Sequence, residues 1–358
     1  MNDYEIADKR EQKSFKGITF SGYKKSEAKK QLLNSLLNNK IEPACYWSIE
    51  FICAGHFIDL WDIILLFYSK YIHLGNPRLP LYLSLRFSSF QDIVLNGYVD
   101  NEIKMRNNKK IRQLFAEIFS ILAISIKKYE MTQIKVSKDD FNISNISDKT
   151  RADKVIYAQS IFRSEDPKEL FIAINEFIYN LTVNKNSRNC FYWLEWLIDY
   201  ETIYKKKNKS DLICATRNLS GLTNKNAKDF IWILWEIILN ESNRLSEHIN
   251  KINLSLIKLF SIKYNSSCKK KRRFLIYSAI SLITEITNFK IPIINDERSI
   301  EAVKSKIDVI YKQVKKSELK PDTDYLFNNS ISKNTNLENT IKKLDKMNSL
   351  NNLIIRKN

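Results

Sequence analysis

Two runs of basic side chains carry the strongest chemical signal in this sequence. The first run is Lys269, Lys270, Lys271, Arg272 and Arg273, just before or at the start of a helix predicted over residues 274–289. Positive charge is unfavourable at a helix N-terminus, so five cations beside unpaired backbone N–H groups there are typical of an anion-binding site. A nucleic-acid phosphate backbone is the natural ligand. A surface loop and a nuclear-localisation-like run are the alternatives.

The second basic run follows the end of an apolar helix and consists of Lys205, Lys206, Lys207 and Lys209. Cations at a helix C-terminus complement the helix dipole, so a solvated helix end would explain these lysines without any ligand. We nevertheless include them with the first run as predicted nucleic-acid-binding residues. The expected contact is with phosphate groups and is not specific for base sequence.

Acid–base chemistry would need a carboxylate or a histidine with a shifted pKa. Glu50, Glu195 and Glu236 lie beside tryptophans within apolar helices, where burial would raise the pKa of a carboxyl group. We favour a structural role, in which each carboxylate pairs with a Lys, an Arg or a neighbouring helix. His56 and Asp59 could form a catalytic pair, but no nucleophile in a matching context accompanies them.

Motifs for cofactors and metals are missing from the sequence. The patterns GxxxxGK[ST], GxGxxG, HExxH and CxxC do not occur, and the chain has only three histidines. We therefore expect no cofactor, no metal site, no catalytic residue and no enzymatic activity.

The charge and the apolar pattern restrict the partners and the compartment. Lys and Arg number 58 against 40 Asp and Glu, which gives a net charge of +18 and favours a polyanionic partner. The abundance of Lys, Asn and Ile is also typical of AT-rich codons, so part of the charge can be compositional. The N-terminus lacks a signal sequence, no apolar run approaches the roughly 20 residues that span a bilayer, and the five cysteines match no disulfide framework. We expect a soluble, intracellular protein that contacts no membrane.

The most apolar part of the chain covers residues 42–95, where prolines and glycines mark the ends of the predicted helices. Apolar residues recur there at three- and four-residue steps from Pro43 to Gly55, and glycine is the usual residue just after a helix end. A second helix is predicted from near Phe57 and a third after Pro77. The first two helices should form an αα-hairpin.

Within this stretch, the run CYWSIEFICAGHFIDLWDIILLFYSKYIHLGNPRLPLYL resembles an uncharacterised protein family of large nucleocytoplasmic double-stranded DNA viruses. The resemblance covers about residues 15–96 and extends faintly to residues 190–240. It brings no established activity, so it implies no catalytic or binding residue. It implies a virus-encoded, intracellular protein of the host cytoplasm, the nucleus or a viral factory.

Composition and periodicity together predict an all-α fold. Glycine and proline number six each, so the chain has few tight turns and favours long helices. The pairs Trp193/Trp196 and Trp232/Trp235 repeat at a spacing near that of two-helix repeats. We predict a multi-helix array of αα-hairpins in a solenoid-like stack, with an irregular helical bundle in two lobes as the alternative. The apolar flanks place the tryptophans in the core; the alternative is a stacking platform for single-stranded nucleic acid.

The polarity of successive segments predicts five parts. A polar N-terminal arm covers residues 1–22, an N-terminal helical lobe residues 23–130 and a linker residues 131–150. A C-terminal helical lobe covers residues 151–316, with a first helix over about residues 152–163. A mobile Asn/Lys-rich tail, with one weak amphipathic segment at Leu337, Ile341, Leu344 and Met347, covers residues 317–358.

Three hypotheses of function follow. The first is a non-enzymatic helical scaffold or accessory factor in viral nucleic-acid transactions, which binds a protein partner and, through the basic runs, phosphate. The second is a structural or assembly protein of the virion with no specific nucleic-acid role. The third, an enzyme with a concealed carboxylate site, requires one of the three glutamates above to line a water-filled pocket.

Overall fold

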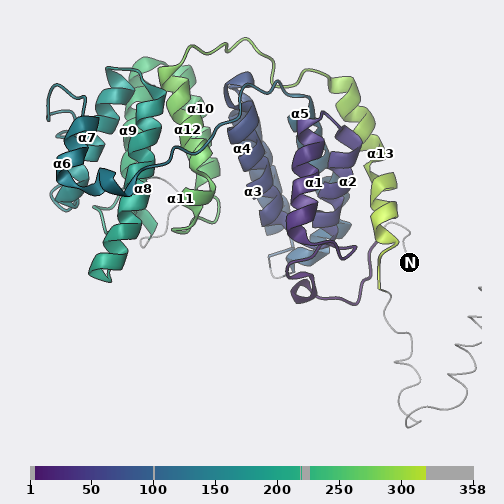
Figure 1. Cartoon of the computed structure of the whole chain (residues 1–358). Coiled ribbons are helices and arrows are strands. Elements are labelled where there is room, and N and C mark those ends of the chain that lie inside the picture. Colours follow the sequence, from purple (N-terminus) through teal and green to yellow (C-terminus); the bar gives the residue numbers. More distant parts are fainter. Residues whose placement is uncertain (1–4, 100, 218, 220–225, 320–358) are drawn as a thin grey trace, which may run out of the picture. The chain divides into compact units, whose positions relative to one another are not determined.

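The computed structural model describes residues 5–99, 101–217, 219 and 226–319, and the described residues are all-α (Figure 1). Within them, the only β-type pairing is an isolated bridge between Ile18 and Lys24. The predicted all-α multi-helix array is confirmed. The helices are α1 (Lys25–Leu37), α2 (Ile41–Cys53), α3 (Phe57–Phe67), α4 (Leu79–Leu95), α5 (Lys109–Ile124), α6 (Ile143–Ile146), α7 (Phe171–Thr182), α8 (Ser187–Asn208), α9 (Ile231–Leu245), α10 (Glu247–Phe260), α11 (Cys268–Lys271), α12 (Arg273–Thr284) and α13 (Glu297–Lys315).

The chain divides into two compact units of very different size. The large unit consists of residues 1–6 and 10–318 and contains all of these helices. The small unit consists of residues 7–9 and 319–358. Most of the predicted tail, including its amphipathic segment, lies outside the described residues.

The predicted αα-hairpin forms between α2 and α3. Helix α2 ends at Cys53, and Gly55 follows with φ +75°, a left-handed conformation that costs glycine little. Helix α3 buries Trp61 against Phe87 and Phe90 of α4 and Phe115 of α5, with ring centroids 5.0–5.9 Å apart. This aromatic cluster is the centre of the N-terminal group of helices.

Helix α13 corrects the predicted domain division. It packs against α2 and α5 of the N-terminal group, although the sequence analysis assigned it to the C-terminal lobe. One face of α13 buries Ile300, Ile307, Tyr311 and Val314, and Asp308 pairs with the buried Arg112 of α5. The N-terminal group is therefore completed by a helix nearly 200 residues away in sequence.

The remaining helices form a second group. Helices α7 and α8 pack together, α9 packs on α10, and α12 contacts α8, α9 and α10. The four tryptophans of the two predicted pairs, on α8 and α9, are buried. Their predicted place in the core is confirmed, and their rings are not available as stacking platforms. Helix α10 also packs on α4, which joins the two groups.

The predicted helix over about residues 152–163 is wrong, because these residues form turns. The carboxylate of Glu176 accepts hydrogen bonds from the backbone N–H groups of Arg151 and Ala152. The side chain of Asn175 bonds the N–H of Ala158 and the carbonyl of Lys154. A helix would have paired the N–H of Ala158 with the carbonyl of Lys154, and the Asn175 side chain bonds both groups instead.

The predicted linker over residues 131–150 is packed onto the helices. Met131 is buried, and its N–H donates to the carbonyl of Lys70. In the middle of the predicted linker, the indole N–H of Trp196 donates to the carbonyl of Asp140, and Phe141 stacks on the same indole. The segment connects α5 to α7, as a linker between the two groups of helices would, but it is packed onto the helices.

The described part of the predicted N-terminal arm is also ordered against the helices. Phe15 and Phe20 are fully buried, and the guanidinium of Arg10 lies over both rings. Ser21 donates through its N–H and its hydroxyl to Glu50 of α2. Residues 10–22 therefore cover one end of the N-terminal group.

The described helices contain no segment whose length and apolar content would allow it to cross a membrane.

Candidate nucleic-acid interface

The first predicted basic run does not form one exposed site. The three lysines of this run lie in helix α11. Arg272 connects α11 to α12, and Arg273 is the first residue of α12. The side chains of Lys269, Arg272 and Arg273 are buried and each pairs with a carboxylate. These three cations are not available to a phosphate backbone, so their predicted role is wrong. Only Lys270 and Lys271 of this run are exposed.

Lys269 is at the centre of a buried charge network. Its Nζ lies 2.5 Å from Oε1 of Glu201 on α8 and 2.7 Å from Oδ2 of Asp229, which precedes α9. The hydroxyl of Tyr264 also donates to Asp229. Burial raises the pKa of Glu201, although the charge of Lys269 acts in the opposite direction. One lysine thus pairs with two carboxylates, and their mutual repulsion is only partly offset.

The two arginines hold helices together. Arg272 donates to Asp62 of α3 and to the carbonyls of Phe260 and Ile262 at the end of α10. Arg273 lies 2.5 Å from Oε2 of Glu195 on α8. A guanidinium satisfies several acceptors at fixed geometry, which suits both positions. Neither pairing has a local signal in the sequence, because the partner of Arg272 is 210 residues away and that of Arg273 is 78 residues away.

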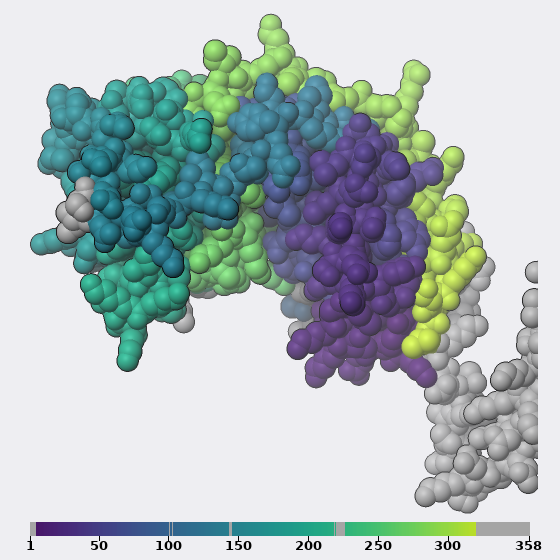
Figure 2. Space-filling view, in the orientation of Figure 1, coloured from purple at the N-terminus to yellow at the C-terminus, as the bar shows by residue number. Residues whose placement is uncertain are grey.

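Lys270 of the first predicted run lies beside the last turns of α8, the helix whose C-terminal end carries the second run. The bond between Lys269 and Glu201 fixes α11 beside the last turns of α8, and Nζ of Lys270 lies 3.0 Å from the hydroxyl of Thr202. Figure 1 shows α11 next to α8, and Figure 2 shows the end of α8 projecting as a teal-green knob. We define the α8–α11 lysine patch as Lys206, Lys207, Lys209, Lys270 and Lys271, all exposed.

Three carboxylates near this patch pair with two lysines. Glu201 and Asp229 pair with the buried Lys269, and Asp211 pairs with Lys205. The predicted residue Lys205 is therefore at the edge of the patch and already has an anionic partner. Among the residues that the structure describes, Lys206, Lys207, Lys209 and Lys271 have no ion-pair partner. The surface thus presents a net positive field to solvent.

The three glutamates considered as acids have protein partners. Glu50 accepts from Ser21. Glu195 accepts from Arg273, Gln133 and Tyr277. Burial raises the pKa of Glu195, and these donors oppose the shift.

Glu236 accepts from Arg163 and from the buried Arg217. Four pockets among the described residues have linings that contain none of Glu50, Glu195 and Glu236. The protein partners and these linings favour the structural interpretation of the three carboxylates over a concealed site at one of them.

The histidine considered as catalytic also has a structural partner. Nε2 of His56 lies 2.8 Å from the carbonyl oxygen of Ile18, and Nδ1 lies 3.7 Å from Oδ2 of Asp59. Asp59 in turn accepts from Lys25 at 2.9 Å. His56 thus ties the N-terminal segment to the start of α3. Within the described ranges, no group of three or more His, Cys, Asp or Glu side chains is arranged to hold a metal ion.

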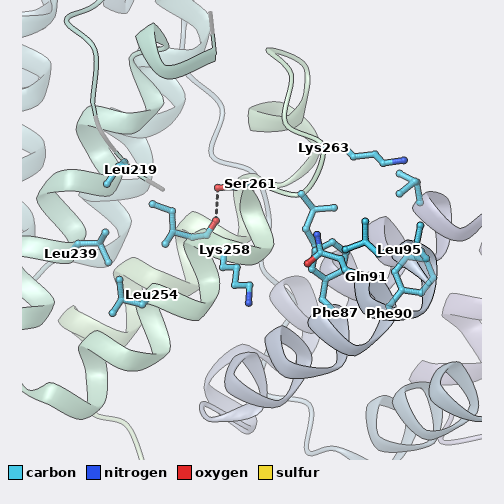
Figure 3. A pocket seen from close by; sticks show the side chains of 14 residues that line it. Phe87, Phe90, Gln91, Leu95, Leu219, Leu239, Leu254, Lys258, Ser261 and Lys263 are labelled. Carbon is cyan, nitrogen blue, oxygen red and sulfur yellow. Dashed lines mark hydrogen bonds between the residues drawn. The ribbon is translucent and has the colours of Figure 1, made fainter. Parts of the chain in front are cut away.

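A second surface feature was not predicted. An apolar groove with a volume of about 700 Å³ lies between α4 and α10 (Figure 3). Helices α4 and α10 carry leucines outside the core, and this excess of apolar residues is the signal that the sequence offers. Leu95 and Leu254, for example, are 70% and 48% exposed. The groove is lined by Ile58, Phe87, Phe90, Gln91, Val94, Leu95, Leu219, Leu239, Leu254, Ile257, Lys258, Ser261, Ile262 and Lys263.

Comparison with known proteins yields no match among family models, curated proteins or solved structures. The interpretation of function therefore depends on the two surfaces described above.

Proposed function

We propose that this protein is a non-enzymatic helical scaffold that contacts nucleic-acid phosphates through the α8–α11 lysine patch. The observation that carries the proposal is the hydrogen bond between Lys270 of α11 and Thr202 of α8, which places the exposed lysines of α11 beside the helix that ends in the second lysine run. Among the nearby carboxylates, Asp211 pairs with Lys205, and Glu201 and Asp229 share the buried Lys269. Clustered exposed lysines attract a polyanion and displace its counterions.

The chemistry of the patch favours phosphate contact without base specificity. Lysine presents a mobile point charge and lacks the planar fork with which arginine binds guanine edges. Five lysines can neutralise about four or five phosphates of a duplex. The logarithm of the binding constant should then fall with the logarithm of salt concentration with a slope of about −4.

The resemblance of residues 15–96 to a viral protein family supports the wider setting of this proposal. We place the scaffold in viral nucleic-acid transactions inside the host cell, where the helical surface would also bind a protein partner. The alternative, a virion structural or assembly protein, predicts weak binding that does not depend on the patch. Binding data on patch variants therefore separate the two functions.

Replacing all five patch lysines with glutamine should weaken binding to a 30-base-pair DNA duplex at about 150 mM salt by at least about thirtyfold. The salt slope should become less steep by about four, because those phosphate contacts are lost. Fluorescence anisotropy over a series of salt concentrations measures both quantities. Single-stranded DNA and RNA of matched length then show whether one form of nucleic acid is preferred.

The matched control replaces five other exposed lysines, Lys13, Lys16, Lys30, Lys135 and Lys306, with glutamine. Both variants have the same net charge, so they differ only in where the charge is removed. The control should lose less than about threefold in affinity. Equal losses in the two variants would show that binding follows total charge, and the patch would lose its proposed role.

A further inference from the structure

The groove between α4 and α10 has the architecture of a helix-binding site. Helix α4 contributes Phe87, Phe90, Gln91, Val94 and Leu95, and α10 with the residues after it contributes Leu254, Ile257, Lys258, Ser261 and Ile262. Each set follows the i, i+3, i+4, i+7, i+8 spacing of a single helix face. Figure 3 shows Phe87, Phe90, Gln91 and Leu95 on one helix, and Leu254, Lys258 and Ser261 on or just after the neighbouring helix. A third helix that packs its own apolar face along these two ridges would cover the groove.

The floor of the groove is firmly supported. Phe87 and Phe90 belong to the buried aromatic cluster of Trp61, with centroids 5.0 Å and 5.9 Å from the indole. The upper walls, by contrast, are open to solvent at Leu95 and Leu254. A contiguous apolar surface on a rigid base is typical of interaction sites, and covering it is favourable by the hydrophobic effect.

The polar residues of the groove determine the charge of its occupant. Its polar lining consists of Gln91, Lys258, Ser261 and Lys263, and no carboxylate is among the described residues that line it. Lys263 has interactions within the protein, so the positive charge offered to an occupant is that of Lys258. Nζ of Lys258 donates to the hydroxyl of Ser88, a neutral partner, at 2.8 Å. An occupant with acidic side chains beside its apolar face would complement this lining.

We propose that the groove binds an amphipathic helix of a partner protein, with leucine-like anchors between α4 and α10 and acidic residues facing Lys258. This inference deepens the protein-binding part of the proposed function and rests on that part alone. It is independent of the lysine patch. Failure of the peptide experiment below would leave the nucleic-acid results unchanged, and the reverse is also true.

Charge complementarity selects a partner protein over the two occupants that the chain itself could supply. Residues 320–358 contain seven basic and four acidic side chains, so this segment would bring like charge to the groove. A second copy of the chain carries the same net charge of +18 and would be repelled in the same way. An acidic helix meets no such repulsion.

The test is the binding of three labelled 16-residue peptides to the full-length protein at about 150 mM salt. The first peptide has leucines at i, i+3, i+4 and i+7 flanked by glutamates. The second has lysines in place of the glutamates. The third has the composition of the first, with the leucines scattered around the helix. We expect the first peptide to bind at least tenfold more tightly than either of the others, because it alone matches both shape and charge.

Variants of the protein locate the binding. Leu95→Gln with Leu254→Gln should weaken binding of the first peptide at least tenfold. The matched control, Leu85→Gln with Leu245→Gln, changes two leucines that are 69% and 39% exposed on α4 and α9 but do not line the groove. It should change binding less than twofold. Lys258→Glu should weaken binding of the acidic peptide and strengthen binding of the lysine peptide. Because all of these side chains are at least partly exposed, circular dichroism should show unchanged folding.

Four results would overturn the proposal. The acidic and basic peptides could bind equally, or the groove pair and the control pair could have the same effect. Binding only after removal of residues 320–358 would identify that segment as the occupant. Self-association that the Leu95→Gln, Leu254→Gln pair abolishes, measured by light scattering, would identify a second copy.

Discussion

Replacing Arg217 with methionine is expected to lower the free energy of unfolding by about 3–5 kcal/mol, the cost of leaving one member of a buried ion pair uncompensated. The guanidinium of Arg217 lies 2.5 Å and 2.6 Å from the two carboxylate oxygens of Asp166, and both side chains are almost completely buried. Arg217 also donates to Glu236 and to the carbonyls of Ala215 and Ile161. Methionine keeps much of the volume but none of these bonds. Urea denaturation at pH 7.5 measures the change.

The defect of the Arg217 variant should depend on pH. Burial alone would raise the pKa of Asp166, but hydrogen bonds from Arg217 and from the backbone of Arg163 and Ala215 keep this pKa below its ordinary value of 3.8. The ionised Asp166 thus adds to the free energy of unfolding of the wild-type protein above pH 3.8. This contribution is lost as the pH falls through the lower pKa of the folded state. Without Arg217, burial dominates and the pKa of Asp166 rises. The buried carboxyl then gains a proton as the pH falls, so the stability difference between variant and wild type should be smaller at pH 4.5 than at pH 7.5.

Arg163→Met is the matched control for this prediction. Arg163 also bonds Glu236, but its side chain is 44% exposed, and exposed ion pairs contribute about 0–1 kcal/mol. The control should therefore remain within about 1 kcal/mol of the wild type. Equal stability of the Arg217 and Arg163 variants would contradict the stabilising role assigned to the buried pair of Arg217 and Asp166.

Replacing Lys269 with methionine should also destabilise the fold by about 3–5 kcal/mol, because Glu201 and Asp229 would then be held close together with no cation between them. Lys270→Met, at the next position, is an ideal control. Lys270 is exposed and donates only to a threonine hydroxyl among the described residues. Its replacement should change the stability by less than about 0.5 kcal/mol. Thermal and urea denaturation of the two variants provide the comparison.

The Lys269 prediction has its own pH dependence. Burial already raises the pKa of Glu201 above its ordinary value of 4.5, and loss of Lys269 removes the main opposing charge. A carboxyl group whose folded pKa is raised binds protons more readily in the folded state, so its unfavourable contribution decreases as the pH falls. The stability difference between Lys269→Met and the wild type should therefore decrease between pH 7.5 and pH 4.5. A difference that grows on acidification would contradict this network.

The sequence predicts local features of the fold well, because local features depend on neighbouring residues. Scarce glycine and proline and the helical period indicate an all-α chain. The end of α2 before Gly55 follows from the backbone freedom of glycine. The buried tryptophans of α8 and α9 follow from apolar residues on every side of them.

Contacts between distant residues could not be predicted in the same way. The apolar stripe of α13 shows that one face is buried, but the stripe does not specify α2 and α5 as the surface that covers it. Residues 152–163 have a helical pattern, yet they form turns. The side chains of Asn175 and Glu176 of α7 accept hydrogen bonds from backbone N–H groups in and just before this segment. In both cases the deciding partner lies elsewhere in the chain.

The basic runs show the same limit at the level of the candidate site. Lys269 and Lys270 are adjacent and chemically identical, but the first is buried between two carboxylates and the second is exposed. Residue type and spacing identify both runs as cationic. Only the positions of Glu201, Asp229, Glu195 and Asp62 show which cations are neutralised inside the fold.

The measurement that tests the central claim most directly is lysine footprinting of the unmodified protein. The protein is acetylated briefly with and without a saturating DNA duplex at about 100 mM salt, and mass spectrometry measures the modification of each lysine. We predict that Lys206, Lys207, Lys209, Lys270 and Lys271 are protected by DNA, whereas the five control lysines remain equally reactive. Uniform protection of both sets, or protection of neither, would contradict the claim that the α8–α11 lysine patch is the nucleic-acid interface.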